Sequence, residues 1–218
     1  MKKFFLIIFS ILSMDQILKI YIKTHFELGG GFFIFPFFRI CFVENPGMAY
    51  GVDFGLGYHG KILLSIFRFI LVCFIFIFFF INIKKGTSKY LTIPLSLIFS
   101  GAMGNFLDSA LYGLLFNTGT IYSQESKKWI PYFGISKANF DFFQKNYPVG
   151  YASFMEGCVV DMFYFPIINT YFPHWIPFFG GYNFQFFKPV FNLSDVVIFI
   201  GVFSLFLFHR KIKNVKIL

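Results

Sequence analysis

Four aspartates in segments of membrane-like composition are the residues of this chain best suited to acid–base chemistry. They are Asp15, Asp108, Asp161 and Asp195, each beside or within a run of apolar residues. A carboxylate at membrane depth is costly, so it is rarely retained unless it faces a protein interior and has a function there. Two carboxylates within hydrogen-bonding distance share one proton, so one can accept a proton from water while the other donates one. We expect Asp161 and Asp195 to form such a pair and to catalyse hydrolysis without a covalent nucleophile.

Helix geometry predicts that the polar residues of three apolar segments reach a common depth. Counted from the basic residues at the inner surface, Asp15 and Lys19 lie at ~18 and ~24 Å, and Asn105 and Asp108 lie at ~22 and ~27 Å. Asp195 lies ~22 Å along its helix from Arg210, the basic residue at the inner surface. Three helices therefore bring carboxylates to one layer at the outer edge of a bilayer.

Each local pair in this layer also has a simpler interpretation. Asp15 and Lys19 are four residues apart and share a helix face, so they could be an ion pair that only makes the two charges tolerable. Asn105 and Asp108 are three residues apart and could serve only to pack one helix against another. Asp195 taken alone could be an acid favoured by the dipole at a helix start.

The composition indicates an integral membrane protein. Of the 218 residues, 57% are hydrophobic, 24% are aromatic and only 13% are charged. A water-soluble globule of this size could not bury that much apolar side chain.

The net charge of +9 does not indicate nucleic-acid binding, because the basic residues flank the apolar runs on one side. They are Lys2, Lys3, Lys84, Lys85, Lys89, Arg210, Lys211, Lys213 and Lys216. This pattern is that of the positive-inside rule and predicts that both termini are cytoplasmic.

The predicted fold is an all-α membrane protein, a single domain over 1–218 with four transmembrane helices. These helices are expected at about 4–23, 61–83, 90–108 (with a possible extension to 116) and 193–209. The first resembles a secretory signal peptide, but it has no small-residue cleavage site, so we expect it to be retained.

The segments between the helices are predicted to lie outside the membrane. The external loop 24–60 is expected to form a small β-sheet cradle around an Asn-Pro-Gly turn. The segment of about 113–157 is predicted to be an inserted extracytoplasmic subdomain, and the stretch 166–190 an aromatic loop near the lipid headgroups.

Neither a metal site nor a cofactor is expected. Cys41, Cys73 and Cys158 lack metal-binding spacing, and the four histidines are scattered. We expect unpaired thiols, although Cys41 and Cys158 could meet outside the membrane.

Five short runs together resemble the lipoprotein signal peptidase (signal peptidase II) family of membrane aspartic proteases. In chain order they are DQILK at 15–19, NPGMAYG at 45–51, GAMGNFLD at 101–108, VVDMF at 159–163 and FNLSDVVIFIG at 191–201. With the helices that carry them they cover about two thirds of the chain.

The resemblance implies a role for each matching residue. Asp161 and Asp195 match the catalytic aspartates of the family. The residues that match its substrate-binding pocket are Asp15, Lys19, Asn45, Gly47, Asn105, Asp108 and Asn192.

The resemblance also implies the substrate. The family removes the signal peptide from diacylglyceryl-modified prolipoproteins, on the amino side of the lipidated Cys. It implies a monomer in the bacterial cytoplasmic (inner) membrane, in contact with membrane lipid, with its active site at the outer, periplasmic face. Such a substrate is an apolar helix in the bilayer, so its scissile bond would lie at the layer of carboxylates.

Ser109 is the main departure from the family pattern, which usually has Arg at this position. A basic residue of the 113–157 insertion could replace that guanidinium. Two alternatives therefore remain open. One is a catalytically dead relative that binds lipoprotein signal peptides, and the other is a small ion or proton transporter that uses the buried acids.

Overall fold

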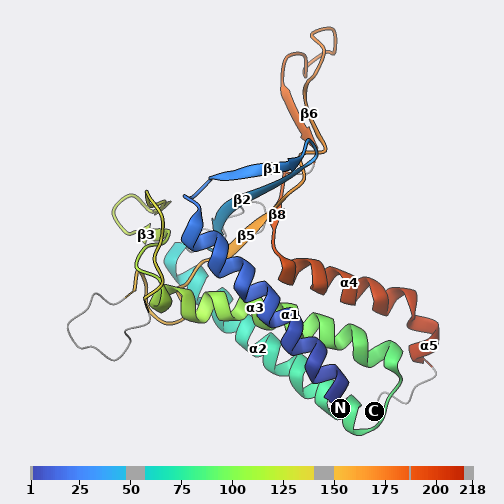
Figure 1. Ribbon diagram of the computed structural model, residues 1–218. Helices are drawn as coiled ribbons and strands as arrows, with labels where there is room; N and C mark the ends of the chain where they lie inside the picture. The colour runs from blue at the N-terminus through green and yellow to red at the C-terminus, as the bar shows by residue number, and fades with distance from the viewer. Residues whose placement is uncertain (1, 48–56, 140–149, 187, 214–218) are drawn as a thin grey trace.

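Residues 2–47, 57–139, 150–186 and 188–213 are described by the computed structural model of the chain. The helices are α1 (Lys2–His25), α2 (Gly57–Lys84), α3 (Lys89–Leu115), α4 (Leu193–Leu207) and the short α5 (His209–Lys213). The first four correspond to the four predicted helices, and the third takes the longer of its two predicted forms. The start of α1 and the end of α4 lie at the same end of the bundle (Figure 1).

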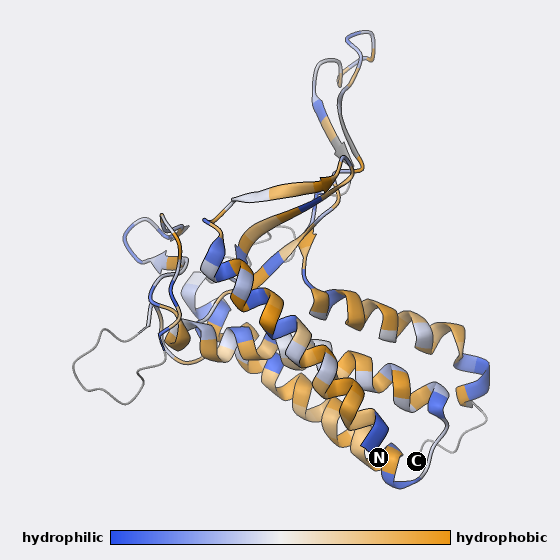
Figure 2. Cartoon of the chain, in the orientation of Figure 1, coloured by the Kyte–Doolittle hydropathy of each residue, from blue (hydrophilic) through white to orange (hydrophobic). Residues whose placement is uncertain are grey.

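Three of these helices, α1, α2 and α3, are long and apolar enough to cross a membrane. The fourth, α4, is apolar but has only 15 residues. Large apolar side chains such as Phe9, Ile70 and Phe206 are exposed on the outer faces of the helices. Figure 2 shows hydrophobic residues along most of the bundle and hydrophilic ones on α5 and around β3. Apolar side chains on the outside of a bundle are what a membrane protein requires.

Helix α3 is the centre of the bundle and packs against α1, α2 and α4. In the most hydrophobic 18-residue stretch of each helix, 50% of the residues are buried in α3, compared with 22% in α1 and 17% in α2. Two glycines allow α4 to approach it closely. A Cβ at Gly101 would lie 2.7 Å from Ile198, and one at Gly201 would lie 2.6 Å from Ile98. Small residues at such contacts are the usual means of close helix packing in membranes.

Two apolar clusters lie on either side of the predicted polar layer. The inner cluster consists of Ile8, Val72, Phe79, Ile83, Leu91, Leu95, Phe99 and Ile212. The outer cluster consists of Ile22, Phe42, Tyr112, Phe116, Val160 and Met162 and joins the helices to a sheet. The polar residues are therefore separated by apolar packing from the end of the bundle where α1 starts and α4 ends.

The sheet is antiparallel, with the strand order β1-β2-β5-β8. Its strands are β1 (Gly31–Phe35), β2 (Phe38–Asn45), β5 (Val159–Tyr164) and β8 (Val190–Phe191). Because β2 pairs with β5, Asn45 and Asp161 come to the same end of the sheet. The chain is therefore a mixed helix-and-sheet protein rather than all-α, because strands far apart in the sequence join in one sheet.

The predicted insertion contains the hairpin of β3 (Ile121–Ser123) and β4 (Lys128–Ile130). Its described part returns to α3: the backbone N–H of Tyr151 donates to Phe116 O at 2.9 Å, and that of Gly157 donates to Ser109 O at 2.9 Å. Helix α3 extends to Leu115, so the segment starts slightly later than the predicted residue 113. Residues 140–149 of the insertion lie outside the described part of the chain.

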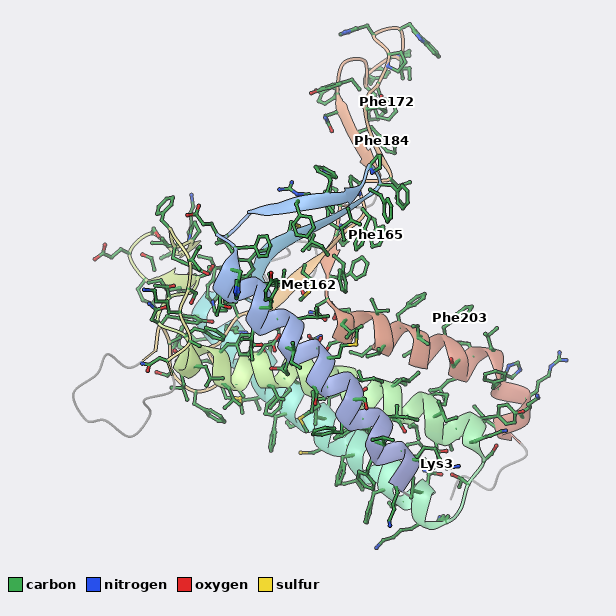
Figure 3. The ribbon with its side chains drawn as sticks, in the orientation of Figure 1. Lys3, Met162, Phe165, Phe172, Phe184 and Phe203 are labelled. Atoms are coloured by element: carbon green, nitrogen blue, oxygen red, sulfur yellow. The ribbon has the colours of Figure 1, made fainter. Side chains whose placement is uncertain are left out.

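The stretch 166–190 was predicted to be a loop, and this prediction was wrong. It contains β6 (Ile168–Tyr171) and β7 (Asn183–Phe186), which form an antiparallel hairpin. The hairpin projects away from the helices, and its labelled Phe172 and Phe184 lie far from the bundle (Figures 1 and 3). The residues after the Asn-Pro-Gly turn, 48–56, lie outside the described ranges.

Candidate active site

Asn192 links the two aspartates of the predicted catalytic pair. Its side-chain amide donates to Asp161 Oδ1 at 2.7 Å, and its backbone N–H donates to Asp195 Oδ2 at 3.1 Å. Its own Oδ1 accepts a hydrogen bond from the Asp195 N–H at 3.0 Å, which completes a capping box at the start of α4. The cap that begins the helix therefore also fixes Asp195 relative to β5, which carries Asp161.

A second amide, that of Asn105 on α3, closes the link from the other side. Its Nδ2 donates to Asp195 Oδ1 at 2.8 Å, and its Oδ1 accepts from Asn192 Nδ2 at 3.1 Å. The two carboxylates thus belong to one hydrogen-bonded network held by two asparagines.

The pKa of Asp161 is raised from 3.8 to about 7. Burial is the main cause, because it disfavours the charged form, and the neighbouring Asp195 carboxylate adds to it. The hydrogen bonds from Asn45 and Asn192 act in the opposite direction. Asp161 can therefore hold a proton near neutral pH.

Asn45 reaches the site from the end of β2. Its amide donates to Asp161 Oδ2 at 3.2 Å, and its Oδ1 accepts from the Gly47 N–H at 2.8 Å. Gly47 has a φ of +114°, a conformation that favours glycine. The turn therefore points the Asn45 amide toward Asp161.

Lys19 is fully buried between two carboxylates. Its Nζ lies 2.9 Å from Asp15 Oδ2 and 2.8 Å from Asp108 Oδ2, and it donates to Asn105 Oδ1 at 3.0 Å. The ion pair of Lys19 with Asp15 predicted from their spacing is therefore present, but it is part of a larger network that extends to α3. A buried charge needs such partners to be tolerated.

Asp15 and Asp108 each make a further contact outside their own helix. Asp15 Oδ1 accepts from the backbone N–H of Ser194 in the first turn of α4, at 2.9 Å. Asp108 Oδ2 accepts from the N–H of Val160 on β5, at 3.4 Å. The nine residues predicted for the site are therefore brought together in one connected polar layer.

Gln16 is a member of this layer that the sequence reasoning missed. Its amide donates to Asp108 Oδ1 at 2.9 Å, and its Oε1 accepts from the Tyr112 hydroxyl at 3.2 Å. The signal was available, because Gln16 is a polar residue next to Asp15 in an otherwise apolar segment.

Arg68 of α2 was also missed. Its Nη1 donates to Ser109 Oγ at 2.6 Å, and Ser109 Oγ donates in turn to the backbone oxygen of Asn105 at 3.1 Å. The guanidinium beside Ser109 therefore comes from α2 and not, as we had considered, from the insertion. An arginine within the predicted span 61–83 was itself a signal of function.

An apolar cavity of about 890 Å³ opens beside Asp195, between the sheet and the start of α4. It is lined by Phe38, Phe163, Phe165, Pro189, Phe191, Leu193, Asp195, Val196 and Phe199. Figure 3 shows Phe165 over the start of α4 and Met162 on the side of the sheet nearer α1. A cavity of this size and composition suits an apolar ligand.

Among the described residues, no group of three or more His, Cys, Asp or Glu side chains could hold a metal ion. Cys41, Cys73 and Cys158 are free thiols, and burial raises the pKa of Cys158 to about 12. A thiol of this kind is mostly protonated at neutral pH and is a poor nucleophile.

The chain resembles known proteins along almost its whole length. The family model described as "Signal peptidase (SPase) II" matches residues 7–210. A protein of Porphyromonas gingivalis named lipoprotein signal peptidase is 38% identical over 201 residues, which are 91% of this chain and 79% of that protein. One of the same name from Amoebophilus asiaticus is 32% identical over 206 residues, 92% of this chain and 74% of that protein.

Solved structures agree in fold. A bacterial membrane enzyme determined at 2.3 Å resolution has a TM-score of 0.58 and 22% identity, over 98% of this chain and 91% of that one. A second, at 1.9 Å resolution, has a TM-score of 0.56 over 95% and 92%. The chain therefore has a membrane-enzyme fold, and it belongs to the signal peptidase II family.

Proposed function

We propose that this chain is an aspartic endopeptidase that removes the signal peptide from diacylglyceryl-modified prolipoproteins at the outer face of a bacterial membrane. The cleavage of lipoprotein signal peptides follows from the family and from the names of its relatives. The observation that carries the aspartic mechanism is the bridging of Asp161 and Asp195 by Asn192.

In the proposed mechanism the two aspartates share one proton. Asp161 holds it at rest, because burial and the Asp195 charge raise its pKa to about 7. Asp195 takes a proton from a water molecule, whose oxygen attacks the scissile carbonyl carbon. Asp161 donates its proton to the carbonyl oxygen. When the tetrahedral intermediate collapses, the C–N bond breaks and Asp195 passes the proton it took from water to the leaving amine. Asp161 regains a proton from the hydroxyl group that becomes the new carbonyl.

The remaining residues hold this pair in place. Asn45 and Gly47 orient Asp161, Asn105 and Asn192 join the two carboxylates, and the buried ion pairs of Lys19 fasten α1 to α3. The apolar cavity beside Asp195 would receive the apolar part of the substrate. In the membrane, α4 would be the fourth span, and both termini would lie in the cytoplasm, as the basic residues at the inner ends require.

Both alternative functions have lost support. The catalytically dead relative was favoured by the missing arginine, but Arg68 brings a guanidinium to Ser109. A transporter would need polar groups that continue toward the inner end of the bundle. An apolar cluster that includes Phe79, Leu95 and Phe99 lies in that region, and the buried hydroxyls of Ser96 and Ser100 there donate to the backbone of their own helix.

The test is cleavage of a purified lipidated preprolipoprotein and of its unlipidated twin. Wild-type protein should cleave only the lipidated form, and Asp161→Asn and Asp195→Asn should each abolish cleavage while the protein still inserts in the membrane. Glu125→Gln, which changes an exposed acid, is the matched control and should remain active. Normal processing by either Asp→Asn variant would exclude the proposed pair.

A further inference from the structure

The polar layer holds more acids than its lysine can neutralise. Asp15 and Asp108 both form ion pairs with Lys19, so most of the charge of this lysine is committed to them. Asp161 and Asp195 are bonded to neutral amides. A second cation near them would therefore change the protonation of the pair more than any neutral neighbour does.

Arg68 is placed to be this second cation. Its side chain approaches from α2, whereas Lys19 approaches from α1. It interacts electrostatically with Asp108, Asp195 and Asp161. Its Nη2 lies 3.9 Å from where a Cβ at Gly47 would be, so it borders the turn that orients Asn45.

The direct contacts of Arg68 with the described residues do not by themselves require an arginine. Its Nη1 donates a hydrogen bond to an uncharged hydroxyl, Ser109 Oγ, and among the residues that the structure describes no carboxylate lies within ion-pair distance of it. Its neighbours on α2, Phe67 and Phe69, are exposed apolar residues. A permanent charge on an apolar helix such as α2 is costly, so it is expected to have a function. The function that its position suggests is an electrostatic effect on the nearby aspartates.

We propose that Arg68 is a positioning residue whose charge keeps the Asp161/Asp195 pair singly ionised at neutral pH. This inference rests on the proposed function. A cation favours the ionised form of a neighbouring acid. Without the charge of Arg68, each aspartate of the pair loses its proton at a higher pH. At neutral pH the pair would then tend to hold two protons instead of the one that the mechanism needs.

Other charged and titratable groups lie near the pair or near Arg68 and remain constant in the comparison. Lys19 of α1 and Cys41 of β2 interact electrostatically with Asp161, and Asp15 forms an ion pair with Lys19. Lys61 of α2, Asp108 of α3 and Cys158, which precedes β5, interact with Arg68. These groups are the same in every variant at position 68, so a shift in the pH profile can be assigned to the charge by comparison with Arg68→Lys and Ser109→Ala.

The experiment is the pH profile of kcat/KM for cleavage of a lipidated preprolipoprotein by the full chain in detergent. Arg68→Gln removes the charge, and Arg68→Leu does so with a side chain that suits a membrane helix, so one neutral variant remains if the other does not fold. In both, the acidic and basic limbs should move up by ~1 pH unit. Arg68→Lys keeps the charge, and Ser109→Ala removes only the hydrogen bond, so their limbs should stay at the wild-type positions.

The outcomes separate this inference from the proposed function. The role of the charge would be overturned if the limbs of the pH profile stay in place in Arg68→Gln and Arg68→Leu. It would also be overturned if Arg68→Lys or Ser109→Ala shifts the limbs as far as the neutral variants do. In either case, cleavage of the lipidated substrate by the wild type leaves the proposed function in place. Failure of the wild type to cleave it would contradict the function itself.

Discussion

The carboxylate of Asp15 on α1 accepts a hydrogen bond from the backbone N–H of Ser194 on α4, at 2.9 Å. The next residue in the chain is Asp195, one of the two proposed catalytic acids. The other oxygen of Asp15 pairs with Lys19. One acid of the first helix therefore holds the first turn of the last helix and, through it, the position of Asp195.

This contact predicts different effects for two substitutions. Asp15→Ala leaves the buried Ser194 N–H without its acceptor and removes one partner of Lys19, so it should lower the free energy of unfolding by about 2–3 kcal/mol. It should also reduce kcat/KM at least tenfold, because Asp195 loses its support. Asp15→Asn keeps an acceptor oxygen and should be affected less. Thermal unfolding in detergent and the cleavage assay measure the two effects, and equal losses in both variants would contradict this role.

The raised pKa of Asp161 predicts how stability depends on pH. The folded chain holds the Asp161 proton up to about pH 7, whereas the usual pKa of an aspartate is 3.8. Between these values the folded state binds more protons than the unfolded state, so the contribution of Asp161 to stability falls as the pH rises from about 4 to about 7. Thermal unfolding across this range should show a smaller decline in Asp161→Asn than in the wild type. Glu125→Gln should keep the wild-type slope, and an identical slope in Asp161→Asn would contradict the shift.

A buried ion pair should hold the inserted segment against the body of the protein. Lys23 on α1 pairs with Glu44 on β2 and donates to Thr118 O at 3.1 Å, and Glu44 Oε2 accepts from the Thr120 N–H at 2.6 Å. Both charged side chains are buried, and the rings of Phe116 and Tyr151 lie about the lysine.

Glu44→Leu would leave Lys23 buried without its counter-charge. It should lower the free energy of unfolding by about 3–5 kcal/mol and speed hydrogen exchange at the Thr120 amide. Glu27→Gln, at an exposed acid of the same region, is the control and should change neither. A protected Thr120 amide in Glu44→Leu would show that the segment is held by other contacts.

The sequence alone determined the class of protein, the helices and the polar residues of the layer. The apolar runs are long enough that only membrane helices can satisfy their backbone groups, and the fixed rise of a helix converts the positions of Asp15, Asp108 and Asp195 into one depth. Polar residues in apolar segments singled out Asp15, Lys19, Asn105, Asp108, Asp161 and Asp195. The roles expected for Asn45, Gly47 and Asn192 came from the resemblance to the signal peptidase II family. The hairpin of β6 and β7 was missed because its two short strands are separated by a long, aromatic, proline-containing connection, which gives no simple alternating pattern.

Only the tertiary structure decided which residues meet. The contact of Asn192 with Asp161 joins a helix cap to a strand through the register of a sheet, and the contact of Arg68 with Ser109 depends on how α2 is rotated against α3. Neither the register nor the rotation follows from local spacing, because both are set by the packing of side chains far apart in the chain. The sequence thus determines which groups reach the layer, while packing determines which of them come into contact.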